Sequence, residues 1–177
     1  SRAAEAAFTL QFAAEEAALP PAWVNMPALA AFGPKLTRLE FDGAVYGSVL
    51  SLPSLREQLD AWRASDGRLE LRRLRLGWGD LDAGLRLSAR LDHALQPALA
   101  GNLSVTNPNA ALDSLARSGL IQRRALDGTK FAVGLLTRRP DQGGLPVAEI
   151  PIHVQNGVVS VAQVPLTRLP PIAWPQH

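Results

Sequence analysis

Two neighbouring carboxylates are the first residues of this sequence that could carry out catalysis. Asp80 and Asp82 flank a turn beside Trp78, and residues two apart on a strand share one face. Two carboxylates at a defined separation could serve as the acid and base of a glycosidase. A structural role is the interpretation we favour, because aspartate is common in turns. We therefore expect Asp80 to support the turn and Asp82 to face solvent.

Other patterns of catalysis and metal binding are absent from the sequence. There is no cysteine, which excludes disulfides, thiolate nucleophiles and cysteine-ligated zinc. The three histidines, His93, His153 and His177, are scattered and have no acidic partners at helical spacing. No nucleophile elbow, phosphate-binding loop or dinucleotide fingerprint occurs. The sequence therefore predicts no enzymatic activity, no metal and no cofactor.

Arginine is the dominant basic residue, and six arginines fall within one predicted hairpin: Arg68, Arg72, Arg73, Arg75, Arg86 and Arg90. A guanidinium group presents a planar fork of donors that suits phosphate or carboxylate groups. A solvated sheet face, balanced by Glu70, Asp82 and Asp92, is the interpretation we favour. The net charge of +2 gives no strong positive field, so we expect no nucleic-acid partner.

The strongest pattern in the chain is an alternation of apolar and polar residues over 81–91. Leucine or alanine occupies every odd position there, which predicts a half-buried antiparallel strand. Leu99 and Leu103 continue the pattern after Gln96-Pro97 on a further strand. Such leucine rows are usually plain core, but an uncovered row could hold an acyl chain, since hydrophobic burial is non-directional. The candidate apolar-ligand residues are therefore Leu81, Leu85, Leu87, Leu91, Leu99 and Leu103.

The segment before this strand changes phase in its middle. Leu69 and Leu71 occupy odd positions, whereas the apolar residues from Leu74 onward occupy even ones. A β-bulge at Arg72–Arg73 would keep both halves on one face. Gly77-Trp78-Gly79-Asp80 then supplies the turn of a hairpin.

Alternation also predicts strands over 8–14, 39–45 and 150–161, the last interrupted by an Asn156-Gly157 hairpin turn. Pro151 and Pro165 lack a backbone donor, so their strands should lie at a sheet edge or end early. Beyond Pro165 we expect an extended, proline-rich tail.

Helices are expected between the strands, beginning with a short one that starts at Pro27 and ends at Gly33. Ser54 and Glu57 form a capping box at the start of a helix that Gly67 closes. Asn107-Pro108 predicts an N-cap and first turn, and a further helix spans about 121–137.

These elements predict one α+β domain over residues 1–177. We expect a twisted, mainly antiparallel sheet of about five to seven strands, with short helices packed on its apolar face. The length of 177 residues suits a single domain. No apolar run approaches the roughly 20 residues that span a bilayer.

Three segments together resemble a known family. They are Leu-Glu-Leu-Arg-Arg-Leu-Arg-Leu-Gly-Trp-Gly (69–79), Leu-Asp-His-Ala-Leu-Gln-Pro (91–97) and Val-Pro-Leu-Thr-Arg-Leu-Pro-Pro-Ile-Ala-Trp-Pro (164–175). The chain resembles the C-terminal portion of a proteobacterial envelope family, domain of unknown function twenty-one twenty-five (DUF2125). The resemblance implies a longer protein with an N-terminal hydrophobic anchor and a mostly β periplasmic region. It supplies no catalytic residues.

Two functions follow as expectations. The first is a non-enzymatic envelope protein, periplasmic and anchored to the inner membrane in its full-length form, that binds a lipid or other apolar ligand on a one-sided sheet. The alternative is a structural or protein-interaction module of the periplasm without a small-molecule ligand. In that case an exposed sheet edge or the proline-rich tail would engage another envelope protein.

Overall fold

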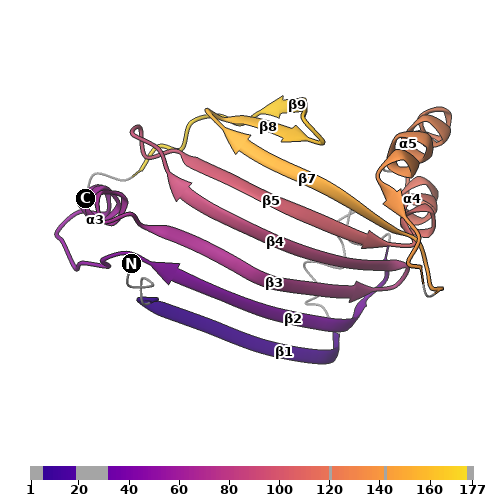
Figure 1. Cartoon of the computed structure of the whole chain (residues 1–177), viewed down its shortest axis with the longest axis horizontal. Helices are drawn as coiled ribbons and strands as arrows, with labels where there is room; N and C mark the ends of the chain where they lie inside the picture. The colour runs from indigo at the N-terminus through magenta and orange to yellow at the C-terminus, as the bar shows by residue number, and fades with distance from the viewer. Residues whose placement is uncertain (1–5, 19–31, 120, 142, 175–177) are drawn as a thin grey trace.

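An antiparallel sheet forms most of the molecule (Figure 1). This computed structural model describes residues 6–18, 32–119, 121–141 and 143–174, so most of the short helix expected from Pro27 lies outside the described residues. Within them, nine strands lie in the order β1-β2-β3-β4-β5-β7-β8-β9, with β6 paired to β7. The strands are β1 (Phe8–Ala18), β2 (Lys35–Tyr46), β3 (Arg68–Trp78), β4 (Leu81–Leu91), β5 (Pro97–Thr106), β6 (Thr137–Arg138), β7 (Val147–Gln155), β8 (Val158–Val161) and β9 (Val164–Arg168).

The α+β class is confirmed, but the expected five to seven strands are too few. The additional strands are the two-residue β6 and β9, which the sequence analysis assigned to an extended tail. Pro165 is accommodated because β9 pairs only with β8 and lies at the sheet edge. The same expectation is wrong for Pro151, because β7 continues through this residue and lies between β5 and β8. Pro151 lies beyond the last β8 pair, at Ile152, and its carbonyl accepts from the Ala162 N–H. The absence of an N–H group on Pro151 therefore leaves no β7–β8 hydrogen bond unmade, because β8 does not pair with β7 at this position.

The bulge expected in β3 is confirmed. Leu71 lies opposite Leu87 and Leu74 lies opposite Leu85, so two β3 residues face the single residue Arg86. The β2–β3 register shifts at the same level. Both halves of β3 therefore present their apolar residues on one side of the sheet.

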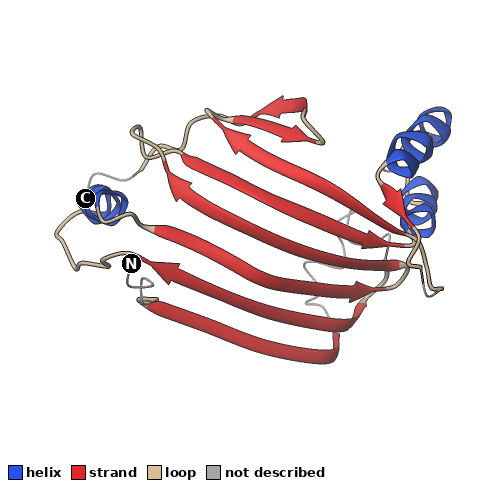
Figure 2. Ribbon diagram, in the orientation of Figure 1, coloured by secondary structure: helices blue, strands red, loops and turns tan. Residues whose placement is uncertain are grey.

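The three described helices stand at the two ends of the strands rather than on the apolar face, which corrects the expected packing (Figure 2). They are α3 (Leu55–Ala64), α4 (Pro108–Arg117) and α5 (Arg123–Leu135). Each helix lies in a connection between antiparallel neighbours, which starts and finishes at the same end of the sheet and needs no crossover. None of these helices is long and apolar enough to cross a membrane.

The helix ends follow local chemistry, with two corrections. Ser54 Oγ accepts from the Glu57 N–H at 3.2 Å, as the capping box predicts. Asp66, not Gly67, adopts the left-handed conformation after α3 (φ 57°), and the Gly67 N–H donates to the Trp62 carbonyl at 2.9 Å. Asn107 is left-handed (φ 48°) and its side chain does not cap α4; its N–H instead donates to the Pro146 carbonyl at 2.7 Å.

Substitution of Gly67 tests the packing at the end of α3, because the missing side chain of this residue permits close contact with the helix. A Cβ on Gly67 would overlap both the Trp62 carbonyl oxygen and the Trp62 ring. We expect Gly67→Ala to lower the free energy of unfolding by about 1–3 kcal/mol, measured by urea denaturation.

Gly128→Ala is the matched control, because a Cβ there, inside α5, meets nothing within 4 Å. That substitution should raise stability by up to about 1 kcal/mol through helix propensity. An equal effect of both substitutions would contradict the packing at Gly67.

Candidate functional site

A continuous apolar surface, which we call the leucine face, covers one side of the central strands. Leu85 on β4 lies opposite Leu74 on β3 and Leu103 on β5. Leu103 in turn lies opposite Ile150 on β7. Residues directly opposite each other in an antiparallel pair share a face.

The structure brings all six predicted leucines onto this face. Leu81, Leu85, Leu87 and Leu91 alternate along β4, and Leu99 and Leu103 lie on β5 in register with them. Each of the six side chains is half-buried. They form part of a larger surface rather than a closed core.

The leucine face extends to the β1 edge through aromatic residues that the sequence analysis did not include in the site. Phe12 lies opposite Phe41, and the two rings stack with centroids 5.3 Å apart. Phe8, Leu10 and Phe12 are 58%, 46% and 45% exposed. The alternation over 8–14 indicated the strand, but its pairing with β2 was needed to place these residues beside the leucines.

One end of the leucine face is closed around Trp78. This residue is 6% exposed, and its indole Nε1 donates to the Gly33 carbonyl at 2.7 Å. The Phe32 ring lies against the Trp78 ring, with centroids 5.6 Å apart. A segment that precedes β2 therefore covers this end of the hairpin.

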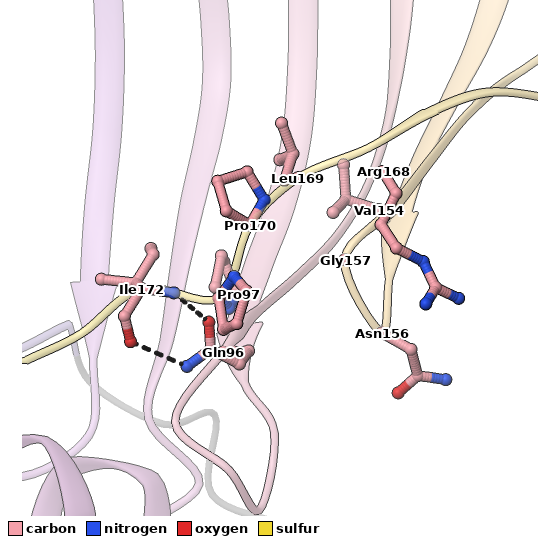
Figure 3. Close-up of a pocket in the computed structure, with 10 residues that line it drawn as sticks. Gln96, Pro97, Val154, Asn156, Gly157, Arg168, Leu169, Pro170 and Ile172 are labelled. Carbon is pink, nitrogen blue, oxygen red and sulfur yellow. Dashed lines mark hydrogen bonds between the residues drawn. The ribbon is translucent and has the colours of Figure 1, made fainter.

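The other end is closed by the C-terminal tail, which leaves β9 and returns to the β4–β5 turn (Figure 3). The Gln96 side chain binds the tail backbone in both directions: its Nε2 donates to the Ile172 carbonyl at 3.1 Å, and its Oε1 accepts from the Ile172 N–H at 2.7 Å. The Trp174 indole Nε1 donates to the carbonyl of buried Leu95 at 2.8 Å. The expected extended tail is thus docked on its own sheet.

The tail and the sheet enclose a cavity of about 220 Å³. Its lining combines Pro97 and Val154 from the sheet with Leu169, Pro170 and Ile172 from the tail. Val154 lies opposite Leu99. The cavity therefore opens beside one of the candidate leucines and is lined mainly by apolar side chains.

Between these two ends, no helix in the described parts of the chain crosses the leucine face, as Figure 1 shows. The long central strands of 10–12 residues rise about 3.3 Å per residue, so the face is roughly 35 Å long. Apolar surface of this extent, without a covering helix, is suited to contact with an apolar ligand.

The paired acids Asp80 and Asp82 have different surroundings. Asp80 Oδ2 accepts from Ser114 Oγ at 2.6 Å and from Arg117 Nη2 at 3.1 Å, so it ties the β3–β4 turn to α4. The Ser114 hydrogen bond, followed by the Arg117 charge, holds the pKa of Asp80 below its usual value. Asp82 is exposed, as expected.

The histidines do not form a cluster. His93 and His153 are both exposed, and His93 Nδ1 lies 3.3 Å from Arg63 Nη1. His177 falls outside the described residues. Among the residues that the structure does describe, no group of three or more acidic, histidine or cysteine side chains could hold a metal ion.

Comparison with known proteins places the chain in a family. The model for DUF2125, described as an uncharacterised protein conserved in bacteria, matches residues 1–170. This match confirms the resemblance found in the sequence. No curated protein and no solved structure matches the chain.

The pKa of Asp80 can be used to test the contact between the β3–β4 turn and α4. Because its folded-state pKa is lowered, ionised Asp80 stabilises the fold above about pH 3.8, and this contribution is lost as the pH falls through the folded-state pKa. We expect Ser114→Ala to raise the pKa of Asp80 toward 3.8, measured by NMR titration of the carboxyl carbon.

Ser118→Ala is the control, because Ser118 Oγ donates to the Leu115 carbonyl rather than to Asp80. It should leave the Asp80 titration unchanged. An unchanged Asp80 pKa in Ser114→Ala would show that this hydroxyl does not hold the carboxylate.

Proposed function

We propose that this chain, which belongs to the DUF2125 family of bacterial proteins, is a non-enzymatic envelope protein that holds a lipid or another apolar ligand on its leucine face. The supporting observation is that this face runs from β1 to β8 with its ends closed and with no described helix across its middle. Large exposed apolar patches mark sites of interaction or ligand binding.

The dimensions of the leucine face suit a hydrocarbon chain. A chain lying along the strands would contact leucine side chains over a length of roughly 35 Å. Burial contributes about 0.8 kcal/mol per methylene, so about ten buried methylenes would contribute about 8 kcal/mol before the cost of immobilising the ligand. The absence of charged residues from the Leu74–Leu85–Leu103–Ile150 row removes any requirement for a matching polar group.

The cavity beneath the tail supports the same proposal. It adjoins the open part of the face at Val154 and Leu99, and its proline and isoleucine walls would surround the end of an apolar chain. The hydrogen bonds between Gln96 and Ile172 hold this cover in place.

The proposed location is the periplasm, with an inner-membrane tether in the full-length protein. The periplasmic location is supported by the resemblance to a family of envelope proteins. A protein that carries an apolar ligand between membranes must shield that ligand from water, and a one-sided sheet would supply part of the shield.

A structural or protein-interaction role is the second candidate, and the β1 edge favours it. Within the described residues β1 pairs only with β2, which leaves an eleven-residue edge free to add a strand from a partner. The proline-rich tail is less suited to this role because it is hydrogen-bonded to its own sheet.

Native mass spectrometry of the protein purified from its natural membrane background separates the two candidates. The lipid proposal predicts a stoichiometric apolar ligand that organic extraction releases. A mass without ligand that remains unchanged after lipid is offered would contradict lipid binding and leave the interaction role.

Leu87→Asp tests whether the leucine face retains the ligand. Because a buried carboxylate without a partner costs several kcal/mol, we expect at least a tenfold loss of retained lipid in native mass spectra. Leu85→Gln provides a second variant without added charge, and circular dichroism checks that both variants fold.

Ser88→Asp is the matched control. Ser88 is the next residue on β4 and faces the opposite side of the sheet, so it receives the same charge without facing the ligand. Equal loss of lipid in Leu87→Asp and Ser88→Asp would argue against binding on the leucine face.

A further inference from the structure

The opposite side of the sheet carries three arginines that make no ion pair with a described carboxylate. Arg72 pairs with Asp42 at 2.6 Å and Arg68 pairs with Glu70 at 2.8 Å. Arg73, Arg75 and Arg86 form no ion pair within 4.0 Å in the part of the chain that the structure describes. Asp42 and Glu40 lie opposite Arg73 and Arg75 across the β2–β3 pair, but their ion pairs are with Arg72 and Arg38. None of the three arginine charges is therefore neutralised by an ion pair of its own.

The β3 bulge places these charges beside one another. The bulged pair Arg72–Arg73 lies opposite Arg86, since the flanking pairs are Leu71 with Leu87 and Leu74 with Leu85. Arg75 lies opposite Gly84, two residues from Arg86 on β4. Like charges that face each other across an antiparallel pair destabilise it. An anion bound between them would relieve this repulsion.

The three arginines line a hollow of about 200 Å³. Gly84 lies at the bottom of the hollow and leaves room for a ligand because it has no side chain. Ser104 Oγ donates to the Gly84 carbonyl at 3.2 Å. Asn102 lies opposite Arg86 and adds an amide donor, while Glu149 lies opposite Ser104 on the far rim. The lining of the hollow holds three guanidinium groups and one carboxylate, and the adjacent Arg72–Asp42 and Arg38–Glu40 ion pairs add no net charge. The resulting local charge of about +2 complements a phosphate dianion.

We propose that this hollow binds a phosphate group, which Arg73, Arg75 and Arg86 hold through charge-assisted hydrogen bonds. Guanidinium groups match phosphate oxygens in bidentate geometry. The hollow and the leucine face lie on opposite sides of the sheet, so the phosphate site stands independently of the proposed apolar ligand. The phosphate belongs either to a free anion or to the headgroup of a second lipid.

Two ligand arms distinguish these sources. Inorganic phosphate is titrated into the protein at low salt and followed by the NMR shifts of the Arg73, Arg86 and Asn102 amides. In parallel, the protein is mixed with phosphatidylcholine vesicles with and without phosphatidic acid. Saturable shifts with inorganic phosphate identify a free anion, and binding only to vesicles with phosphatidic acid identifies a headgroup.

Arg86→Gln tests the site in both arms. It should weaken binding at least tenfold, and it should raise the melting midpoint of the unliganded protein at low salt, because it removes the repulsion with Arg73. The second effect does not depend on any ligand.

Arg124→Gln is the control, because it removes the same charge from exposed α5. It should leave binding and the melting midpoint unchanged. Absence of binding in both arms, or equal weakening in Arg86→Gln and Arg124→Gln, would overturn the proposal. Because these readouts involve no apolar ligand, failure here leaves the leucine-face proposal intact.

Discussion

The single extra residue at the β3 bulge is the constraint on which the two surfaces of the sheet depend. Side chains alternate along a strand, so a regular β3 could not place both Leu71 and Leu74 on one side. With the bulge, the apolar residues of both halves of β3 align with Leu85 and Leu87 on β4. The same extra residue gathers Arg73 and Arg86 on the other side. One local irregularity thus produces an apolar face and a cationic hollow.

The connections between strands explain why none of the three described helices covers the apolar face. Because β2 and β3 are antiparallel neighbours, and so are β5 and β7, their helices remain at the ends of the sheet. The C-terminal tail and Phe32 close the two ends instead, through contacts with Gln96 and Trp78. Among the described residues no helix crosses the middle of this face, and this is the observation on which the proposed function rests.

Local patterns in the sequence were sufficient for the features that depend on neighbouring residues. Alternation located β4, the change of phase after Leu71 located the bulge, and Asn156-Gly157 located a turn in which both residues have positive φ. The three described helices were located along the chain, but their packing at the ends of the sheet could not be predicted, since an amphipathic pattern does not identify what its apolar side contacts. The edge position expected for the strand with Pro165 is confirmed, but the sequence did not separate β9 from the extended tail, and only its pairing with β8 shows it as a strand of its own.

The central claim is that the leucine face contacts an apolar ligand directly. Intermolecular nuclear Overhauser effects between a long-chain fatty acid and the methyl-labelled protein would measure that contact. The account predicts contacts from the acyl protons to the methyl groups of Leu85, Leu87 and Leu103 in the middle of the sheet. Saturable binding whose contacts are confined to exposed α5 residues such as Leu135, or an absence of any contact to β4 and β5, would contradict it.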